Sequence, residues 1–170
     1  MIVIVGHWED NKTNPFSGRL DDVGRWINQL IAYGIDRLVM VDDTKAKVPI
    51  EILQAVAIDS PEPLARDFKI ERANSLEEAL KLYPKLTKVY VESRILLPEK
   101  VTKVTSLFDF VHPANAIYIF GGDFVAPFLA RVPDVSKDEV VSIDYTNSQV
   151  SLYAQEALAC ILYDRAMKER

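Results

Sequence analysis

The chain alternates between short apolar runs and longer stretches in which apolar residues recur every three or four positions. Runs of four or five residues, bounded by Gly, Pro or acidic residues, are typical of strands buried in a parallel sheet. These patterns predict six strands, at residues 2–5, 37–41, 68–71, 88–91, 117–120 and 140–143.

Helical spacing fills the intervals between these strands. Leu20, Val23, Ile27 and Leu30 lie on one face of a helix that stops at Tyr33-Gly34. Similar patterns predict helices at residues 49–57, 75–83, 98–110 and from 151 onward, and a short helical turn at 123–130. Strands that alternate with helices predict an α/β fold with a mainly parallel sheet and helices on both faces. The length of 170 residues suits one domain, residues 1–170.

Composition narrows the class of protein. Cys160 is the single cysteine and no apolar run approaches the roughly 18 residues of a membrane span, so we expect a cytoplasmic protein without a membrane partner. The net charge of −5 argues weakly against a strong nucleic-acid binder. Residues 66–103 nevertheless carry nine Lys or Arg and six Asp or Glu, which leaves room for a local basic face.

Several familiar functional motifs are missing. The sequence contains neither the glycine fingerprint of dinucleotide binding nor a phosphate-binding loop. Its two histidines, His7 and His112, lack a neighbouring set of metal ligands, so no metal site is expected. We expect His112, before a proline, to have a structural role at a helix end; a ligand contact for His7 stays open.

Two loops that follow buried strands are the candidates for a binding site. Gly121-Gly122-Asp123 follows the strand 117–120, and the polar segment 144–150 leads from the next strand to Ser151. Ligands of open parallel sheets collect outside the carboxyl ends of the strands, where both loops would lie. Each loop could instead have a purely structural role, as a tight turn, a helix cap or a solvated connection.

These loops resemble the second and third motifs of the SPOUT superfamily of S-adenosylmethionine-dependent RNA methyltransferases, in its SpoU/TrmH-type branch. Ile119-Phe120-Gly121-Gly122-Asp123 is similar to the second motif, with Asp in place of Glu. Ile143 and Ser151 keep the spacing of the third motif, Leu152 matches it, and Leu162-Tyr163-Asp164-Arg165 resembles the end of its closing helix. The chain departs from the third motif at Asp144, Asn147 and Tyr153.

The resemblance implies a carboxyl-terminal trefoil knot within residues 90–155, S-adenosylmethionine as cofactor, and a homodimer. Dimer contacts would come from the helices at residues 20–33 and 152–168. Residues implied in cofactor binding are Ser93, Gly121, Gly122, Asp123, Ile143, Tyr145, Asn147, Ser151 and Leu152.

The implied activity is ribose 2′-O methylation of RNA, with tRNA as the expected substrate. A guanidinium could stabilise the developing alkoxide. The family's arginine position is occupied by Asn28, so Arg19 or Arg25 are the candidates, with Asn14 as a positioning group. Alternatives stay open: both arginines could be solvated helix charges, the chain could be an inactive SPOUT-fold protein that binds RNA or a ligand, or it could be a nucleotide-binding α/β domain of another family.

Overall fold

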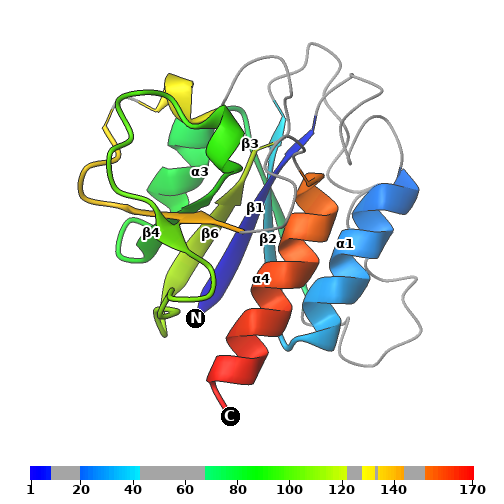
Figure 1. The fold of residues 1–170 in the computed structure, drawn as a ribbon. Coiled ribbons are helices and arrows are strands. Elements are labelled where there is room, and N and C mark those ends of the chain that lie inside the picture. The colour runs from blue at the N-terminus through cyan, green and yellow to red at the C-terminus, as the bar shows by residue number, and fades with distance from the viewer. Residues whose placement is uncertain (9–19, 43–67, 122–127, 133, 144–151) are drawn as a thin grey trace.

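The computed structural model describes residues 1–8, 20–42, 68–121, 128–132, 134–143 and 152–170. Seven parallel strands form one sheet in the order β3-β2-β1-β6-β4-β7-β5 (Figure 1). The strands are β1 (Ile2–Trp8), β2 (Arg37–Asp42), β3 (Lys69–Ala73), β4 (Thr87–Val91), β5 (Thr105–Ser106), β6 (Ala116–Phe120) and β7 (Glu139–Ser142). All six predicted strands are thus confirmed, and the α/β class with its parallel sheet is confirmed with them.

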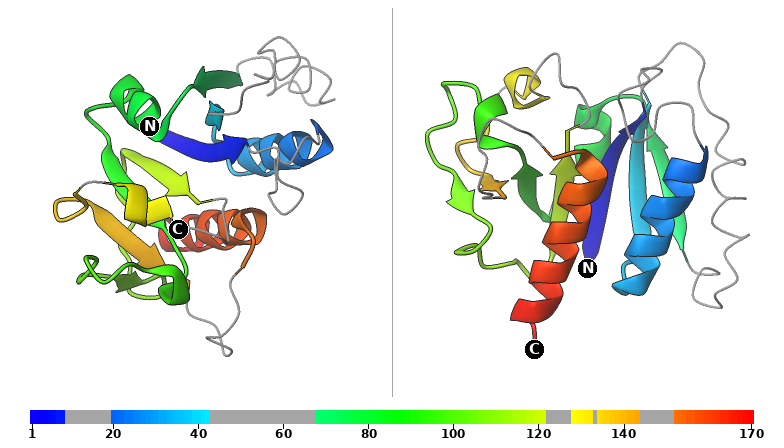
Figure 2. Two further views of the ribbon diagram at one scale, coloured as in Figure 1. Left: turned by 90° about the horizontal axis from the view of Figure 1, so that it is seen from above. Right: turned by 45° about the vertical axis from the view of Figure 1, so that its right-hand side comes forward.

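Helices cover both faces of the sheet. Helices α1 (Leu20–Ala32) and α4 (Ala154–Lys168) lie side by side on one face, and α3 (Leu76–Leu82) lies on the other (Figures 1 and 2). Two layers of core follow from this arrangement: Ile4, Trp26 and Leu158 belong to the first, and Val5, Ala79 and Ile117 to the second. All five residues of β6 are buried because the central strand is covered from both sides.

Local signals in the sequence explain the helix ends. Gly34, with a φ of 68°, ends α1, and the amide of Ile35 donates to the Leu30 carbonyl at 2.9 Å in a Schellman motif. The Ser75 hydroxyl caps α3 by accepting a hydrogen bond from the amide of Glu78 at 3.1 Å. Both ends lie where the capping residues predict them.

The remaining predicted helices lie outside the described residues or begin at another residue. The helix at 49–57 and residues 123–127 of the turn predicted at 123–130 lie outside the described residues, and Phe128–Arg131 form the 3₁₀ helix η3. Helix α4 begins at Ala154, with Tyr153 as its N-cap, instead of at Ser151.

The helix predicted at residues 98–110 is wrong. The chain there forms turns and the short edge strand β5, which pairs with β7 through Thr105 and Val141. Four of the six residues at 101–106 are β-branched, which disfavours a helix and favours a strand. The β7 edge supplies the partners for the backbone groups: the amide of Leu107 donates to the Ser142 carbonyl at 2.8 Å.

A buried polar cluster joins the end of α4 to the segment before β6. Arg165 Nη1 donates to the Tyr118 hydroxyl at 3.4 Å, and His112 Nδ1 lies 2.7 Å from that hydroxyl oxygen. His112 Nε2 lies 2.8 Å from Asp164 Oδ2, and Lys168 Nζ is 2.8 Å from the same carboxylate oxygen. The tyrosine hydroxyl, which accepts from arginine, can donate to Nδ1, which places the histidine proton on Nε2 facing Asp164. His112 thus has a structural role, although it does not end a helix.

Burial of the imidazole lowers the pKa of His112; Asp164 acts in the opposite direction, and Arg165 and Lys168 act in the same direction as burial. The side chain is 2% exposed, so the neutral form is the one that the fold favours.

In the part of the chain that the structure describes, no helix has both the length and the apolar character needed to cross a membrane.

Candidate functional site

A cavity lies at the carboxyl edge of the sheet, where β4 and β6 end beside the start of α4. Its volume is about 390 Å³, part of it open to solvent. The described lining comes from the end of β4 and the two residues after it (Val91, Glu92, Ser93), the end of β6 and the next residue (Phe120, Gly121), Ile143 after β7, and Leu152 with the start of α4 (Ala154, Ala157). A concave, largely apolar site with few polar groups is typical of small-molecule binding.

The fold brings together four residues that the sequence singled out. Ser93, Gly121, Ile143 and Leu152 come from four separate segments and all line this cavity. Their order in the sheet explains the meeting, because β4 lies between β6 and β7 and all three strands end at the same edge.

Of the other predicted site residues, the structure describes only Arg25. Asn14, Arg19, Gly122, Asp123, Tyr145, Asn147 and Ser151 lie outside the described residues. Arg25 is exposed on α1 and does not belong to the described cavity lining.

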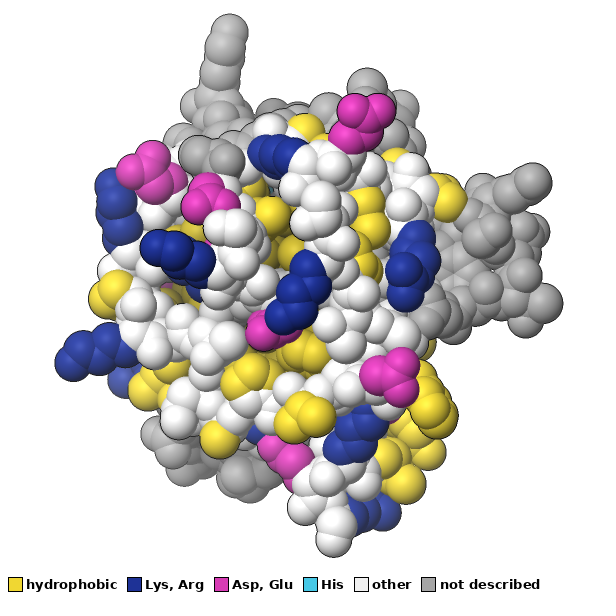
Figure 3. Space-filling model, turned by 60° about the vertical axis from the view of Figure 1, so that its left-hand side comes forward, with side chains coloured by type: hydrophobic (Ala, Val, Ile, Leu, Met, Phe, Trp, Pro, Cys, Tyr) yellow, Lys and Arg dark blue, Asp and Glu magenta, His cyan; other side chains and the backbone are white. Residues whose placement is uncertain are grey.

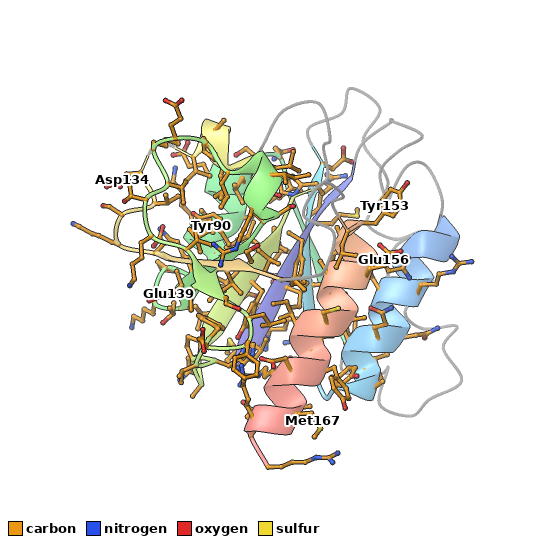
Figure 4. The ribbon with its side chains drawn as sticks, in the orientation of Figure 1. Tyr90, Asp134, Glu139, Tyr153, Glu156 and Met167 are labelled. Atoms are coloured by element: carbon orange, nitrogen blue, oxygen red, sulfur yellow. The ribbon has the colours of Figure 1, made fainter. Side chains whose placement is uncertain are left out.

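The apolar walls of the cavity are fixed by packing. Phe120 is 1% exposed and meets the buried Trp26 of α1 edge to ring, with ring centroids 5.7 Å apart. Ala154 and Ala157 present small side chains from α4, which leaves space between the helix and the strand ends. Tyr153 and Glu156 lie at this end of α4, and Met167 lies at the other (Figure 4).

Glu92 is a cavity residue that the sequence analysis missed. Its amide donates to the Val141 carbonyl at 3.1 Å, which continues the β4–β7 ladder by one residue. Its carboxylate oxygen Oε1 accepts a hydrogen bond from the Ser93 amide at 2.9 Å. The signal in the sequence was its place, directly after the buried run that ends at Val91 and therefore at the ligand edge of the sheet.

Burial sets the charge of this carboxyl group. It raises the pKa of Glu92 from 4.5 to about 7, while the hydrogen bond from the Ser93 amide acts in the opposite direction. At neutral pH the group is therefore divided between its protonated and ionised forms. It can accept a hydrogen bond from a ligand or take up a proton in the cavity.

His7 lies near the end of β1 and contacts the end of β6. Its Nδ1 is 2.9 Å from the Phe120 carbonyl oxygen, so Nδ1 carries the proton and donates, which joins the ends of β1 and β6. His7 is not one of the described lining residues. Within the described ranges, no three His, Cys, Asp or Glu residues gather in a way that could hold a metal ion.

Comparison with known proteins gives a likeness of fold. No protein-family model and no curated protein matches the sequence. Among solved structures, a Bacillus anthracis protein assigned as an RNA methyltransferase superposes with a TM-score of 0.64 at 15% identity, over 99% of this chain and 92% of that chain. The SpoU methyltransferase AviRb from Streptomyces viridochromogenes, solved with AdoMet, has a TM-score of 0.63 at 16% identity, over 99% of this chain.

A third structure, the TrmH/SpoU tRNA modifying enzyme of A. aeolicus, has a TM-score of 0.59 at 15% identity, over 99% of this chain. This chain spans 57% of the length of AviRb and 76% of the A. aeolicus enzyme. Nearly every residue of the shorter chain therefore has a counterpart in these folds. The chain has the fold of the SpoU-type RNA methyltransferases.

Proposed function

We propose that the protein is an S-adenosylmethionine-dependent RNA methyltransferase. The observation that carries the proposal is the cavity between the ends of β4 and β6 and the start of α4, on a fold shared with AviRb, whose crystal structure contains AdoMet. Val91, Phe120 and Ile143 offer apolar surface to an adenosine, and Ser93 and Glu92 offer polar groups. The residues present therefore fit the cofactor.

The cofactor would supply an activated methyl group, and the protein's residues would bind and orient it. Ser93, Gly121, Ile143 and Leu152 would hold it from the described side of the cavity, and Gly122, Asp123, Tyr145, Asn147 and Ser151 complete the proposed set. Close approach of the backbone is the contribution expected of the glycines.

The finer proposal is ribose 2′-O methylation of tRNA. Arg19 or Arg25 would stabilise the alkoxide that forms as the hydroxyl loses its proton, and Asn14 would position the ribose. Arg25 is an exposed residue of α1, and α1 lies beside α4 (Figure 1). RNA as substrate and a single cysteine both agree with a cytoplasmic location.

A homodimer and a knot belong to the same proposal. Tyr163 and Met167 are 60% and 47% exposed on one stripe of α4 with the half-buried Cys160, an apolar face that suits a second copy of the chain. The knot within residues 90–155 is supported by the strand order, since β7 lies beyond β4 whereas α4 packs back near β6.

RNA would be held by scattered basic groups. Figure 3 shows Lys and Arg side chains spread among Asp and Glu on the face that carries β4 and β7. A surface of this kind, together with the net charge of −5, favours a modest affinity with a shallow dependence on salt.

The test is transfer of a tritiated methyl group from S-adenosylmethionine into bulk tRNA and other RNAs. Ala154→Phe, which fills the cavity, should abolish transfer. Ala166→Phe places the same ring three turns along α4, beside the other end of the sheet, and should retain transfer. Absence of methylation in every RNA with the folded wild-type protein, or full activity of Ala154→Phe, would contradict the proposal.

One observation favours a second candidate, a protein that binds the cofactor or RNA without catalysis. Asn28, at the position where the resemblance implies an arginine, is exposed on α1, and an amide cannot supply the positive charge of a guanidinium. Binding of S-adenosylhomocysteine without methyl transfer to any RNA would support this candidate.

A further inference from the structure

Glu92 stands apart from the rest of the cavity by its chemistry. Of the described residues that line the cavity, it alone has an ionisable side chain. It follows the last residue of β4, accepts from the Ser93 amide, and shares the cavity with the apolar side chains of Val91 and Phe120. A half-buried carboxylate in such surroundings needs hydrogen-bond donors to offset its lost hydration.

The structure supplies one such donor. The Ser93 amide donates to Oε1 at 2.9 Å, and within the described ranges Oε2 has no hydrogen-bond partner. Among the described residues, no cation forms an ion pair with the carboxylate: Arg94, two residues further along the chain, is exposed, and Glu156 on α4 and His7 on β1, the titratable groups of neighbouring elements, are not cavity-lining residues. The described residues therefore leave a position on Oε2 that a ligand could occupy.

We propose that Glu92 is a specificity-determining residue, whose Oε2 accepts a hydrogen bond from a hydroxyl or ammonium group of the bound cofactor. The inference rests on the proposed function, because it names how the cavity would distinguish its ligand. The donor is a neutral hydroxyl or amine of the nucleoside, or the cationic ammonium of the amino-acid end.

A proton should leave Glu92 when the ligand binds. The raised pKa of about 7 means that the empty cavity holds a proton on Glu92 below neutrality, and a ligand donor favours the ionised form. If only the ionised form binds well, affinity should rise about tenfold between pH 6 and pH 8, the fraction ionised being about one tenth at the lower pH.

Calorimetric titration with S-adenosylhomocysteine at pH 6, 7 and 8 tests this. Glu92→Gln keeps the size of the side chain but has one acceptor oxygen, which the Ser93 amide already occupies. The variant should bind about tenfold or more weakly at pH 8, with an affinity that does not change with pH. Titration in two buffers of different ionisation enthalpy should show proton release at pH 7 in the wild type and none in the variant.

Glu99→Gln is the matched control, because Glu99 is an exposed carboxylate a few residues further along the chain. It should bind like the wild type at each pH, and circular dichroism should show that both variants are folded. Equal affinities of Glu92→Gln and wild type at every pH, with binding retained, would overturn the inference and leave the proposed function standing. Failure of the wild type to bind at pH 8 would instead contradict the proposed cofactor.

Titration of 5′-methylthioadenosine, which lacks the amino-acid end, separates the two sources of the donor. A retained difference between wild type and Glu92→Gln assigns the hydrogen bond to the nucleoside. A difference seen with S-adenosylhomocysteine and lost with 5′-methylthioadenosine assigns it to the ammonium group.

Discussion

Replacing Glu92 by Gln should make the empty protein more stable at high pH. The pKa of the folded group is raised from 4.5 to about 7, so between these values the folded protein retains a proton that the unfolded chain releases. The contribution of Glu92 to stability is therefore greatest below pH 4.5 and is lost as the pH rises to 7. The glutamine variant carries no such dependence.

The magnitude follows from the two pKa values. Between pH 5 and pH 8 the wild type should lose about 2.5 kcal/mol relative to the variant, because each pKa unit corresponds to about 1.4 kcal/mol. With an m-value of about 2 kcal/mol/M for a chain of this size, the midpoint of urea unfolding should separate by about 1 M more at pH 8 than at pH 5.

The assay is urea unfolding followed by far-ultraviolet circular dichroism, in the absence of ligand, at both pH values. Groups that titrate elsewhere affect both proteins alike, so the change in their difference isolates Glu92. Glu99→Gln, at an exposed position, should follow the wild type. A stability difference between Glu92→Gln and wild type that stays the same from pH 5 to pH 8 would refute the reasoning.

Substitutions at four further positions test the fold. His112→Phe should lower the unfolding free energy by about 2 kcal/mol, because it removes two partly buried hydrogen bonds to Tyr118 and Asp164. The pKa of His112 is lowered in the fold, so the wild type should lose stability as the pH falls through about 6.5. His112→Phe should lack this pH-dependent loss when urea unfolding is compared at pH 7.5 and pH 5.5. Lys168→Met should cost about 1 kcal/mol in the same assay, since its ammonium group donates to the carbonyls of Leu107, Phe108 and Phe110 at 2.6, 2.9 and 3.1 Å; an equal stability would show these contacts to be unimportant. Gly34→Ala should lower the unfolding free energy by about 1 kcal/mol, measured as a lower urea midpoint. A Cβ at this position would meet nothing within 4 Å, so the cost comes from the φ of 68°, and Gly34→Asn should cost less. Ser75→Ala should cost about 1 kcal/mol through loss of the cap on α3, and a thermal midpoint equal to that of the wild type would contradict the role of the hydroxyl.

The parallel sheet could be predicted because its strands are marked locally. A strand buried on both faces needs a run of apolar residues, and Ile2–Val5 and Ile117–Phe120 are such runs. The ends of α1 and α3 could also be predicted, because Gly34 and Ser75 allow hydrogen bonds to backbone groups that lie within a few residues of them.

The segment 98–110 could be predicted only in part from its own residues, because the β-branched residues at 101–106 favour a strand without showing what it would pair with. Its apolar positions fit a helical spacing, but the β7 edge, more than thirty residues further along the chain, offers hydrogen-bond partners that a helix would leave unused. Val101 and Val104 pack against one core layer and Leu107 and Phe110 belong to the other, a division that one helix could not make. Contacts with distant parts of the chain therefore determined that this segment forms a strand and not a helix.

Part of the candidate site could be predicted because some of its residues belong to local sequence patterns. Gly121 and Ile143 belong to patterns with a recognisable spacing, so they could be found in the sequence. Glu92 is one of 25 acidic residues, and nothing in the chain beside it reveals that it will be half-buried with a single hydrogen-bond donor. That environment exists only after β4 has been placed between β6 and β7.

The position of β1 in the interior of the sheet, between β2 and β6, has a consequence for synthesis on the ribosome. The strand is translated before both of its neighbours, and one of them, β6, is translated more than a hundred residues later. At about 5–20 residues per second, one edge of Ile2–Val5 would wait on the order of ten seconds for its partner. A nascent apolar strand with an open edge is a template for aggregation, so folding of this protein should depend on chaperones that hold the amino-terminal segment until the second half of the chain has emerged.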